Sequence, residues 1–271
     1  MGDEAEYQRL NRLWWDERVP VHADSDFYDL DGFVAGRDTL QPFEPEVVRE
    51  VAGLDLVHLQ CHMGMDTLSW ARRGARVTGL DFSAPAIDTA RSLADRIGVE
   101  DARFVVADVY DAVEVLGTDY DLAYQSLGSL NWHPDIDRWA AVLAALIRPG
   151  GRYFLLEAHP LGWILDDDGE RVENGYFFDP RGNRWIDEGG TYADLSAKTV
   201  NNETLEYTHA VSEVITALLR AGLVLEHFAE HPYAVHAMWP WLEERGHRQW
   251  FAPEGRPALP MMYSLMARRS D

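Results

Sequence analysis

The stretch Leu54–Ser83, LDLVHLQCHMGMDTLSWARRGARVTGLDFS, decides the fold of this chain. It opens with an apolar run, turns at Gln60–Asp66, continues with apolar residues at helical spacing, and closes with a second apolar run ending on Asp81. This pattern predicts a strand, a turn, a helix and a second strand. Asp81 lies about 20 residues beyond the turn, where a carboxylate in nucleotide-binding units accepts hydrogen bonds from ribose hydroxyls.

The turn departs from the fingerprint of dinucleotide-binding proteins. That fingerprint would place glycines near Gln60, His62 and Gly64, so that the backbone can touch a pyrophosphate. Only Gly64 is a glycine, and side chains at the other two positions block that approach. The turn therefore argues against a nicotinamide or flavin dinucleotide. A ligand with adenosine but no phosphate, such as S-adenosylmethionine, makes no such demand.

On these residues the chain resembles the class I S-adenosylmethionine-dependent methyltransferases. Their usual turn has an acidic residue where His58 stands and glycines where Gln60 and His62 stand. The resemblance implies an α/β fold with a doubly wound, mostly parallel, seven-stranded Rossmann-like sheet. It also implies S-adenosyl-L-methionine as cofactor and S-adenosyl-L-homocysteine as product, with Gln60, His62 and Gly64 beside the methionine half of the cofactor.

The next segments continue the same alternation. After Asp81, the residues Phe82 and Ser83 join the expected cofactor site, and a helix is predicted from about Pro85 to Ile97. The strand Ala102–Ala107 ends in Asp108 and Val109. The resemblance implies that Asp108 accepts from the adenine amino group while Val109 packs on the ring. Taken alone, Asp108 is equally suited to cap a helix.

A fourth strand is predicted over Asp119–Ser126, and its polar tip, Gln125 and Ser126, should line the cofactor pocket. A helix over Ile136–Ile147, a Pro-Gly-Gly turn and a strand over Arg152–Glu157 follow. This order again resembles the methyltransferases, and it places the loop before the helix beside the transferring methyl group. The resemblance covers roughly residues 50–160.

Residues 1–50 precede the first strand and contain aromatic residues at helical spacing. One interpretation is a helical flap that covers one edge of the sheet. The other is a lid over the cofactor, with Tyr7 or Trp15 near the sulfonium and Arg18 or Arg37 near the methionine carboxylate. Tyr28 is an equally good aromatic candidate, since a cation over an aromatic face gains roughly 0.5–2 kcal/mol.

The segment 159–208 interrupts the alternation and is rich in Gly, Asp, Asn and aromatic residues. Short antiparallel strands around Asn183–Tyr192 and Glu203–His209 are predicted, because a structureless loop of this length is uncommon in a compact domain. They form a cap on the carboxyl edge of the sheet, where ligands bind in open α/β sheets. We expect one domain with four parts: a lid (1–50), a cofactor-binding half (51–158), a substrate cap (159–208) and the remainder of the sheet (209–271), with a helix over Ser212–Ala221 and strands over Leu223–Ala229 and Tyr263–Arg268.

Three histidines fall at the predicted mouth of the active site: His209, His133 and His159, in order of preference as a catalytic base. Each is also suited to a plain wall or hydrogen-bonding role. His58 lies within the first strand and is expected to be a satisfied core residue. The ten histidines show no metal-ligand spacing, so no metal site is expected.

Composition limits the remaining choices. The chain has 271 residues, a net charge of −22, no run long enough to span a bilayer, and a charged beginning in place of a signal sequence. A soluble cytoplasmic protein, monomer or homodimer, is expected, with neither nucleic acid nor membrane as partner. The single cysteine, Cys61, excludes disulfides within the chain and is expected to fill the core.

The favoured function is methylation of a small molecule, a metabolite or natural-product intermediate, at nitrogen, oxygen or carbon. An acidic, aromatic-rich cap suits a small cationic or amphipathic acceptor. One alternative is a catalytically inactive protein that binds S-adenosylmethionine and serves as a regulator or scaffold. Another α/β nucleotide-binding enzyme, such as a dehydrogenase, is opposed by the missing glycines.

Overall fold

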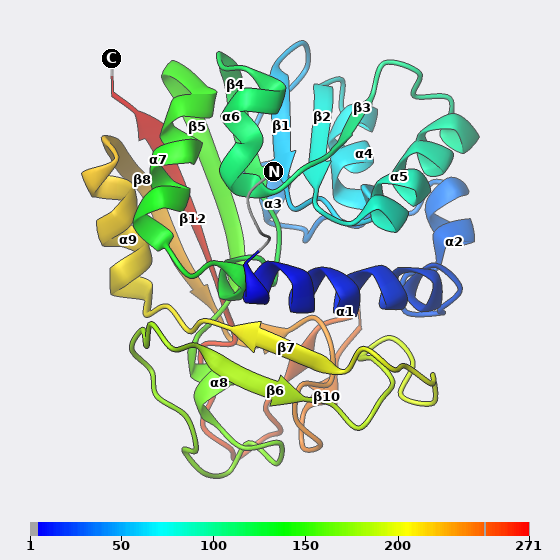
Figure 1. The fold of residues 1–271 in the computed structure, drawn as a ribbon, viewed down its shortest axis with the longest axis vertical. Coiled ribbons are helices and arrows are strands. Elements are labelled where there is room, and N and C mark those ends of the chain that lie inside the picture. The colour runs from blue at the N-terminus through cyan, green and yellow to red at the C-terminus, as the bar shows by residue number, and fades with distance from the viewer. Residues whose placement is uncertain (1–4, 247, 271) are drawn as a thin grey trace.

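A seven-stranded sheet forms the centre of the computed structural model, which describes residues 5–246 and 248–270 (Figure 1). The strand order is β3-β2-β1-β4-β5-β12-β8. Neighbouring strands from β3 to β5 are parallel, whereas β12 is antiparallel to both of its neighbours. The predicted doubly wound, mostly parallel sheet is thus confirmed. Its strands are β1 (Asp55–Leu59), β2 (Arg76–Asp81), β3 (Arg103–Val106), β4 (Tyr120–Gln125), β5 (Ile147–Ala158), β8 (Leu223–His231) and β12 (Met262–Arg269).

Helices cover both faces of the sheet, and each face has its own apolar core. On one side lie α6 (Ala112–Leu116), α7 (Ile136–Leu146) and α9 (Val211–Arg220); on the other lie α2 (Leu30–Val34), α3 (Glu44–Val48), α4 (Met65–Arg72) and α5 (Ala84–Ile97). Among the described residues, no helix combines the length and apolar character needed to cross a bilayer.

Local sequence explains where the longer sheet helices begin and end. The Ser83 side chain caps α5 by accepting from the Ala86 amide, and Gly98 ends the helix at a φ of 71°. Asp135 caps α7 by accepting from the Arg138 amide. The helices predicted from these segments are confirmed.

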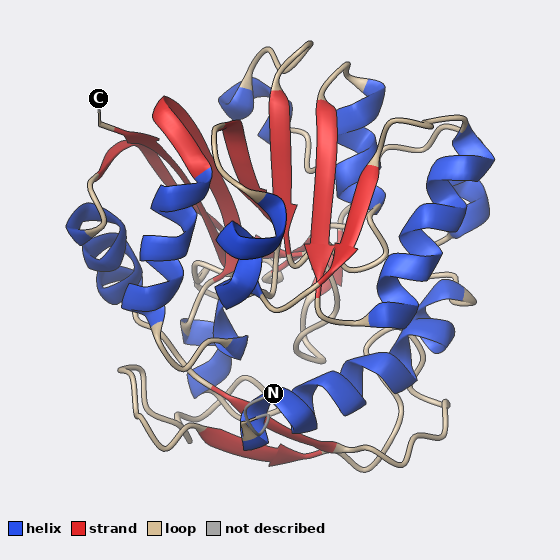
Figure 2. Cartoon of the chain, turned by 45° about the horizontal axis from the view of Figure 1, so that its top comes forward, coloured by secondary structure: helices blue, strands red, loops and turns tan. Residues whose placement is uncertain are grey.

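The N-terminal helix α1 (Glu6–Ala23) runs across the carboxyl ends of the parallel strands (Figures 1 and 2). It lies between the sheet and the cap, against β7 (Glu203–Glu206) on one side and α5 on the other. The helix therefore lies across the carboxyl ends of the strands and does not run along an outer strand of the sheet; we call it the lid. Because the carboxyl ends of the strands form the ligand-binding edge of such sheets, α1 closes that edge.

The cap contains the predicted antiparallel pair, β6 (Asn183–Ile186) with β7, preceded by the short helix α8 (Leu161–Ile164). A second small sheet was not predicted. It is formed by β9 (Tyr233–Ala234), β10 (Glu243–Glu244) and β11 (Trp250–Phe251) within the tryptophan-rich segment. Two 3-10 helices follow strand tips: η1 (Val109–Asp111) after β3 and η2 (Leu130–Trp132) after β4.

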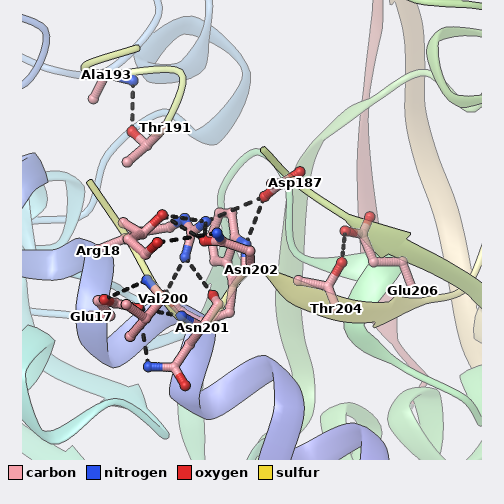
Figure 3. A network of polar contacts seen from close by, with 12 residues as sticks. Glu17, Arg18, Asp187, Thr191, Ala193, Val200, Asn201, Asn202, Thr204 and Glu206 are labelled. Atoms are coloured by element: carbon pink, nitrogen blue, oxygen red, sulfur yellow. Dashed lines mark hydrogen bonds and ion pairs between the residues drawn. The ribbon is translucent and has the colours of Figure 1, made fainter. Parts of the chain in front are cut away.

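Arg18 fastens the lid to the cap (Figure 3). Its guanidinium is fully buried and donates to the Asn201 carbonyl at 2.8 Å and to the Asn202 side chain at 3.1 Å. It also pairs with Asp187 at 3.3 Å and lies over the Trp14 ring, 3.9 Å from the centroid. The expectation that Arg18 meets a methionine carboxylate is therefore wrong for this structure, because cap acceptors surround the guanidinium.

Other residues of α1 strengthen the same junction. The Glu17 carboxylate accepts from the backbone amides of Val200 and Asn201 (Figure 3). The Asn11 side chain donates to the Leu205 carbonyl and accepts from its amide, as a neighbouring strand would. The lid and the cap are consequently held together by hydrogen bonds between segments about 180 to 190 residues apart.

We expect Arg18→Leu to lower the free energy of unfolding by about 2–3 kcal/mol, because buried acceptors on the cap lose a charged donor. Urea titration followed by tryptophan fluorescence measures this change. Arg181→Leu is the matched control, since Arg181 is exposed and pairs with Asp179, two residues before it; it should leave the midpoint unchanged. Equal midpoints for wild type and Arg18→Leu would contradict the role assigned to Arg18.

A buried carboxyl group on α3 gives the stability a pH dependence. Burial raises the pKa of Glu44 to about 8, and Asp66 adds repulsion, while the Tyr124 hydroxyl donates to Glu44 at 2.6 Å. Because the folded-state pKa is raised from 4.5, this contribution to stability is complete below pH 4.5 and is lost as the pH rises through about 8.

The unfolding free energy of the wild type minus that of Glu44→Gln should therefore fall between pH 5 and pH 8.5. Urea titrations of both proteins at the two pH values measure this difference, and the comparison cancels the titration of the other buried groups. For Glu46→Gln, on the exposed side of the same helix, the corresponding difference should not change with pH. A difference for Glu44→Gln that stays constant over this range would refute the assignment.

Candidate active site

A cavity of about 370 Å³ lies between α1 and the carboxyl ends of the parallel strands. Its size falls within the range of sites for small molecules. The wall is built by α1 and by the residues that follow β1, β2, β3 and β4, which is where ligands bind in this type of sheet. The lining residues are Tyr7, Gln8, Asn11, Arg12, Gln60, Phe82, Ala107, Asp108, Val109, Tyr110, Trp132 and His133.

Four residues from the expected cofactor site thus meet in the cavity wall: Gln60, Phe82, Asp108 and Val109. Asp108 also caps the helix η1, as expected from its position after a strand. One of its carboxylate oxygens accepts from the Tyr110 amide at 2.8 Å. The other oxygen accepts from the Gln8 side chain at 2.9 Å. Asp108 can therefore combine a capping role with a position at the wall.

Asp81 lies at the tip of β2 and is buried. One of its oxygens accepts from the His62 amide and the other from the Ser83 amide, both at 2.9 Å. Burial raises its pKa to about 6, although these amides act in the opposite direction. Ser83 caps α5 and donates its hydroxyl to Asp16 on the lid at 2.7 Å. Neither Asp81 nor Ser83 is among the residues that line the cavity.

The turn after β1 holds three residues at positive φ: Gln60 at 55°, His62 at 48° and Gly64 at 73°. A left-handed conformation costs a non-glycine residue roughly 1–2 kcal/mol, which explains why related turns contain glycine. At Gly64 the space is also restricted, because an added Cβ would lie 2.7 Å from Phe104 and 2.8 Å from Ala90. The side chains at Gln60 and His62 must therefore contribute contacts that offset the strain.

His62 contributes through an imidazole cluster beneath the lid. Its Nε2 lies 3.2 Å from His22 Nδ1, and His22 Nε2 lies 3.0 Å from the Thr191 hydroxyl of the cap. The Trp15 and Tyr28 rings pack on His62 with centroids 5.1 and 5.4 Å away. Burial lowers the pKa of both histidines, that of His22 to about 4, so both are neutral near pH 7. His22 was missed because its partners are distant in sequence.

Gln125 and Ser126 lie behind the cavity wall and are not among its lining residues. The Gln125 side chain is fully buried and donates to Gln60 Oε1 at 2.6 Å. The Ser126 hydroxyl instead lies 3.1 Å from His58 Nε2. His58 is fully buried and also bonds Thr67 at 2.7 Å, so its expected place as a satisfied core residue is confirmed.

The three candidate bases have different surroundings, and only His133 lines the cavity. His209 Nε2 donates to the His133 carbonyl at 2.8 Å, and its Nδ1 is sealed from solvent without a partner. His159 Nδ1 accepts from the Leu161 amide, and its Nε2 faces Glu230 at 3.2 Å. The expected convergence thus holds for His133 and His209 only, and the preferred candidate, His209, positions a loop.

Burial lowers the pKa of all three histidines, that of His133 to about 3. Each is therefore neutral at pH 7. Glu157, at the end of β5, is likewise structural: one of its oxygens accepts from the Ser129 amide and hydroxyl and from the Leu130 amide, which fixes the loop after β4.

Arg37 is also engaged away from the cavity, because its guanidinium donates to the Tyr28 and Asp29 carbonyls. The Tyr28 hydroxyl contacts that of Tyr192 at 2.6 Å. Cys61 is buried, and burial raises its pKa well above the usual value, as suits a core filler. Within residues 5–246 and 248–270, no group of three or more His, Cys, Asp or Glu side chains could hold a metal ion.

Several wall residues were missed by sequence reasoning. Gln8, Asn11 and Arg12 lie one, four and five residues after Tyr7 and share one face of α1 with it. That periodicity was the available signal, although it does not reveal which partner the face meets. Tyr110 and Trp132 belong to the 3-10 helices after β3 and β4, which have no sequence pattern of their own.

Comparison with known proteins agrees with this architecture. Residues 57–151 match the family described as a methyltransferase domain. A ubiquinone biosynthesis O-methyltransferase from Methylobacterium is 33% identical over 159 residues, which cover 55% of this chain and 60% of that protein. One from Erwinia tasmaniensis is 25% identical over 60% of this chain and 64% of its own length. The chain thus spans less than two thirds of these relatives.

Solved structures share the fold. The CcbJ methyltransferase from Streptomyces caelestis has a TM-score of 0.61 at 13% identity, covering 96% of this chain and 98% of that one. An S-adenosylmethionine-dependent methyltransferase from Mesorhizobium loti has a TM-score of 0.57 at 22% identity, covering 87% and 100%. Residues 57–151 thus match a methyltransferase domain, and the chain shares the seven-stranded fold of S-adenosylmethionine-dependent methyltransferases.

Proposed function

We propose that this chain binds S-adenosylmethionine in the cavity under α1 and methylates a hydroxyl oxygen of a small molecule. The observation that carries the proposal is the cavity itself, where residues following four parallel strands meet beneath a helical lid. The O-methyltransferase names of the relatives support oxygen over nitrogen or carbon as the acceptor atom.

The cavity residues suit the adenosine half of the cofactor. Phe82 and Val109 offer apolar surfaces for an adenine ring, and the Asp108 carboxylate suits its amino group. Asp81 lies next to Phe82, where its carboxylate would accept from ribose hydroxyls. Side chains at Gln60 and His62 leave no room for a pyrophosphate against the backbone, which opposes a dinucleotide.

Aromatic side chains in and near the cavity wall suit a sulfonium ion. The Tyr7 and Trp132 rings lie in the wall, and Trp15 packs on Trp132 with ring centroids 5.6 Å apart. A desolvated cation gains up to about 2 kcal/mol over such rings. When bound, the cofactor supplies a methyl group already activated by the sulfonium, so the chain needs to align the acceptor and exclude water.

Each of the four parts of the chain then has its own role. Residues 1–50 act as the lid, 51–158 bind the cofactor, 159–208 cap the acceptor, and 209–271 complete the sheet. The net charge of −22 opposes nucleic acid and anionic lipid as acceptors. A small acceptor that fits beside Trp132 and His133 is therefore proposed.

Thermal unfolding with added ligands tests the cofactor assignment. S-adenosylhomocysteine at about 100 times its dissociation constant should stabilise the protein by about 2.7 kcal/mol, whereas NAD at the same concentration should not shift the melting temperature. Asp108→Leu should reduce the shift, and Asp111→Leu, on the solvent side of the same segment, should retain it. A shift with NAD alone would overturn the proposal.

A further inference from the structure

A chain of side-chain amides lies directly behind the cavity, and its first member is Gln60. The Gln60 Nε2 donates to the Ser129 carbonyl at 3.0 Å. A carbonyl can only accept, so the orientation of this amide is fixed. Its oxygen, Oε1, therefore faces the other two partners, Gln125 and His133, at 2.6 and 2.9 Å.

The second member of the chain is fixed independently. Trp139 Nε1, which can only donate, lies 3.1 Å from Gln125 Oε1. The Tyr153 hydroxyl donates to the same oxygen at 3.0 Å. Gln125 must therefore direct its Nε2 at Gln60. The Ser129 carbonyl fixes the orientation of the Gln60 amide, and the Trp139 N–H fixes that of the Gln125 amide. Both orientations agree that Gln60 Oε1 acts as an acceptor.

This requirement determines the tautomer of His133. Because Gln60 Oε1 cannot donate, the His133 nitrogen that faces it, Nε2, must bear the proton. Burial lowers the pKa of His133 to about 3, so the ring is neutral and Nδ1 carries a lone pair. Neighbouring rings hold the imidazole in place: Tyr110 lies 5.5 Å away, and Trp139 is stacked at 6.5 Å.

That lone pair is available to a ligand. His133 lines the cavity, and within the described part of the chain its Nδ1 has no hydrogen-bond partner. It is also not one of the polar atoms that are sealed from solvent without a partner, as His209 Nδ1 is. The His133 backbone is held as well, since its carbonyl accepts from His209.

We propose that the amides of Gln60 and Gln125 hold His133 as the Nε2–H tautomer, so that Nδ1 accepts a hydrogen bond from the hydroxyl or amine that is methylated. Gln60 and Gln125 are then positioning residues. The proposal rests on the proposed methyl transfer and requires that the reacting atom of the acceptor carries a proton, which excludes acceptors without an O–H or N–H bond there.

A hydroxyl acceptor loses its proton as it is methylated. The acceptor oxygen forms its bond to the methyl carbon while the carbon–sulfur bond breaks and sulfur keeps that electron pair. The O–H bond breaks with its pair remaining on oxygen, and the proton passes to His133 Nδ1 and then to solvent. Gln60 Oε1 continues to accept from Nε2–H, and it stabilises the positive charge on the ring.

Nitrogen NMR of protein labelled with ¹⁵N-histidine tests the tautomer without cofactor or acceptor. His133→Gln identifies the His133 signals by their loss. In the wild type at pH 7, we expect a protonated Nε2 and an unprotonated Nδ1. A protonated Nδ1 would overturn the proposal. Since no turnover is needed, this result is independent of whether the proposed methyl transfer occurs.

Variants of Gln60 test the cause. Gln60→Met removes the acceptor and should produce a mixture of the two His133 tautomers. Gln60→Glu keeps an acceptor, should retain the Nε2–H form, and should raise the pH at which His133 titrates. An unchanged tautomer in Gln60→Met would show that the amide chain does not set it. If Gln60→Met does not fold, the titration of His133 in Gln60→Glu tests the proposal alone. An unchanged titration midpoint of His133 would exclude contact between residue 60 and His133 and would overturn the proposal.

Discussion

Asp81→Ala is expected to weaken binding of S-adenosylhomocysteine by about 100-fold. In the proposed complex, the alanine removes two charge-assisted hydrogen bonds to ribose, each worth roughly 1.5–3 kcal/mol. Isothermal titration calorimetry measures the change. Since the pKa of Asp81 is raised to about 6, the wild-type affinity should also fall as the pH drops through 6 and the carboxylate gains a proton.

The structure adds a second effect to this variant. Asp81 accepts from the His62 and Ser83 amides, so alanine also leaves two amides without their acceptor and should lower the melting temperature. Asp81→Asn retains one acceptor oxygen, and it should separate weaker binding from loosening of the turn. Asp88→Ala, exposed on α5, is the control. An unchanged dissociation constant in Asp81→Ala would remove Asp81 from the site.

His133→Ala should lower turnover by about 100-fold, with the affinity for S-adenosylhomocysteine changed less than about threefold. This 100-fold loss lies at the lower end of the range for removal of a proton-transfer group, because a base with a low pKa accepts a proton less readily. Single-turnover rates with a hydroxylated acceptor, together with calorimetry, separate the two quantities.

His159→Ala is the matched control for this variant. The His159 ring contacts Glu230 and the Leu161 amide and does not line the cavity, so turnover should remain near that of the wild type. Full activity in His133→Ala would mean that alignment of the acceptor with the methyl group suffices for the reaction and that His133 does not act as a base. Loss of activity only in His159→Ala would place the acceptor elsewhere.

The sheet was predictable because its information is local. The strand from Leu54 onward, the acidic tips at Asp81 and Asp108, and the helix with Pro85 in its first turn all follow from patterns within a few residues. Their order resembled that of the class I methyltransferases, and this resemblance supplied the topology of the seven-stranded sheet.

The site was less predictable because its contacts join distant segments. Arg18 looked free to meet a carboxylate, but the acceptors that surround it lie about 180 residues later. Gln60 looked like a departure from glycine, and its purpose emerges only with Ser129 and His133 beside it. His209 follows the cap as predicted, yet its N–H is used by the His133 carbonyl.

Transfer of a labelled methyl group tests the central claim most directly. The protein is mixed with S-adenosylmethionine carrying a ¹³C-methyl group and a panel of phenols, aliphatic alcohols and amines, and the carbon signal is followed by NMR. We predict that the signal moves from the sulfonium to an oxygen-bound methyl of one acceptor class, and that His133→Ala slows this movement. A protein that binds the cofactor but leaves the signal on the sulfonium across the whole panel would contradict the account.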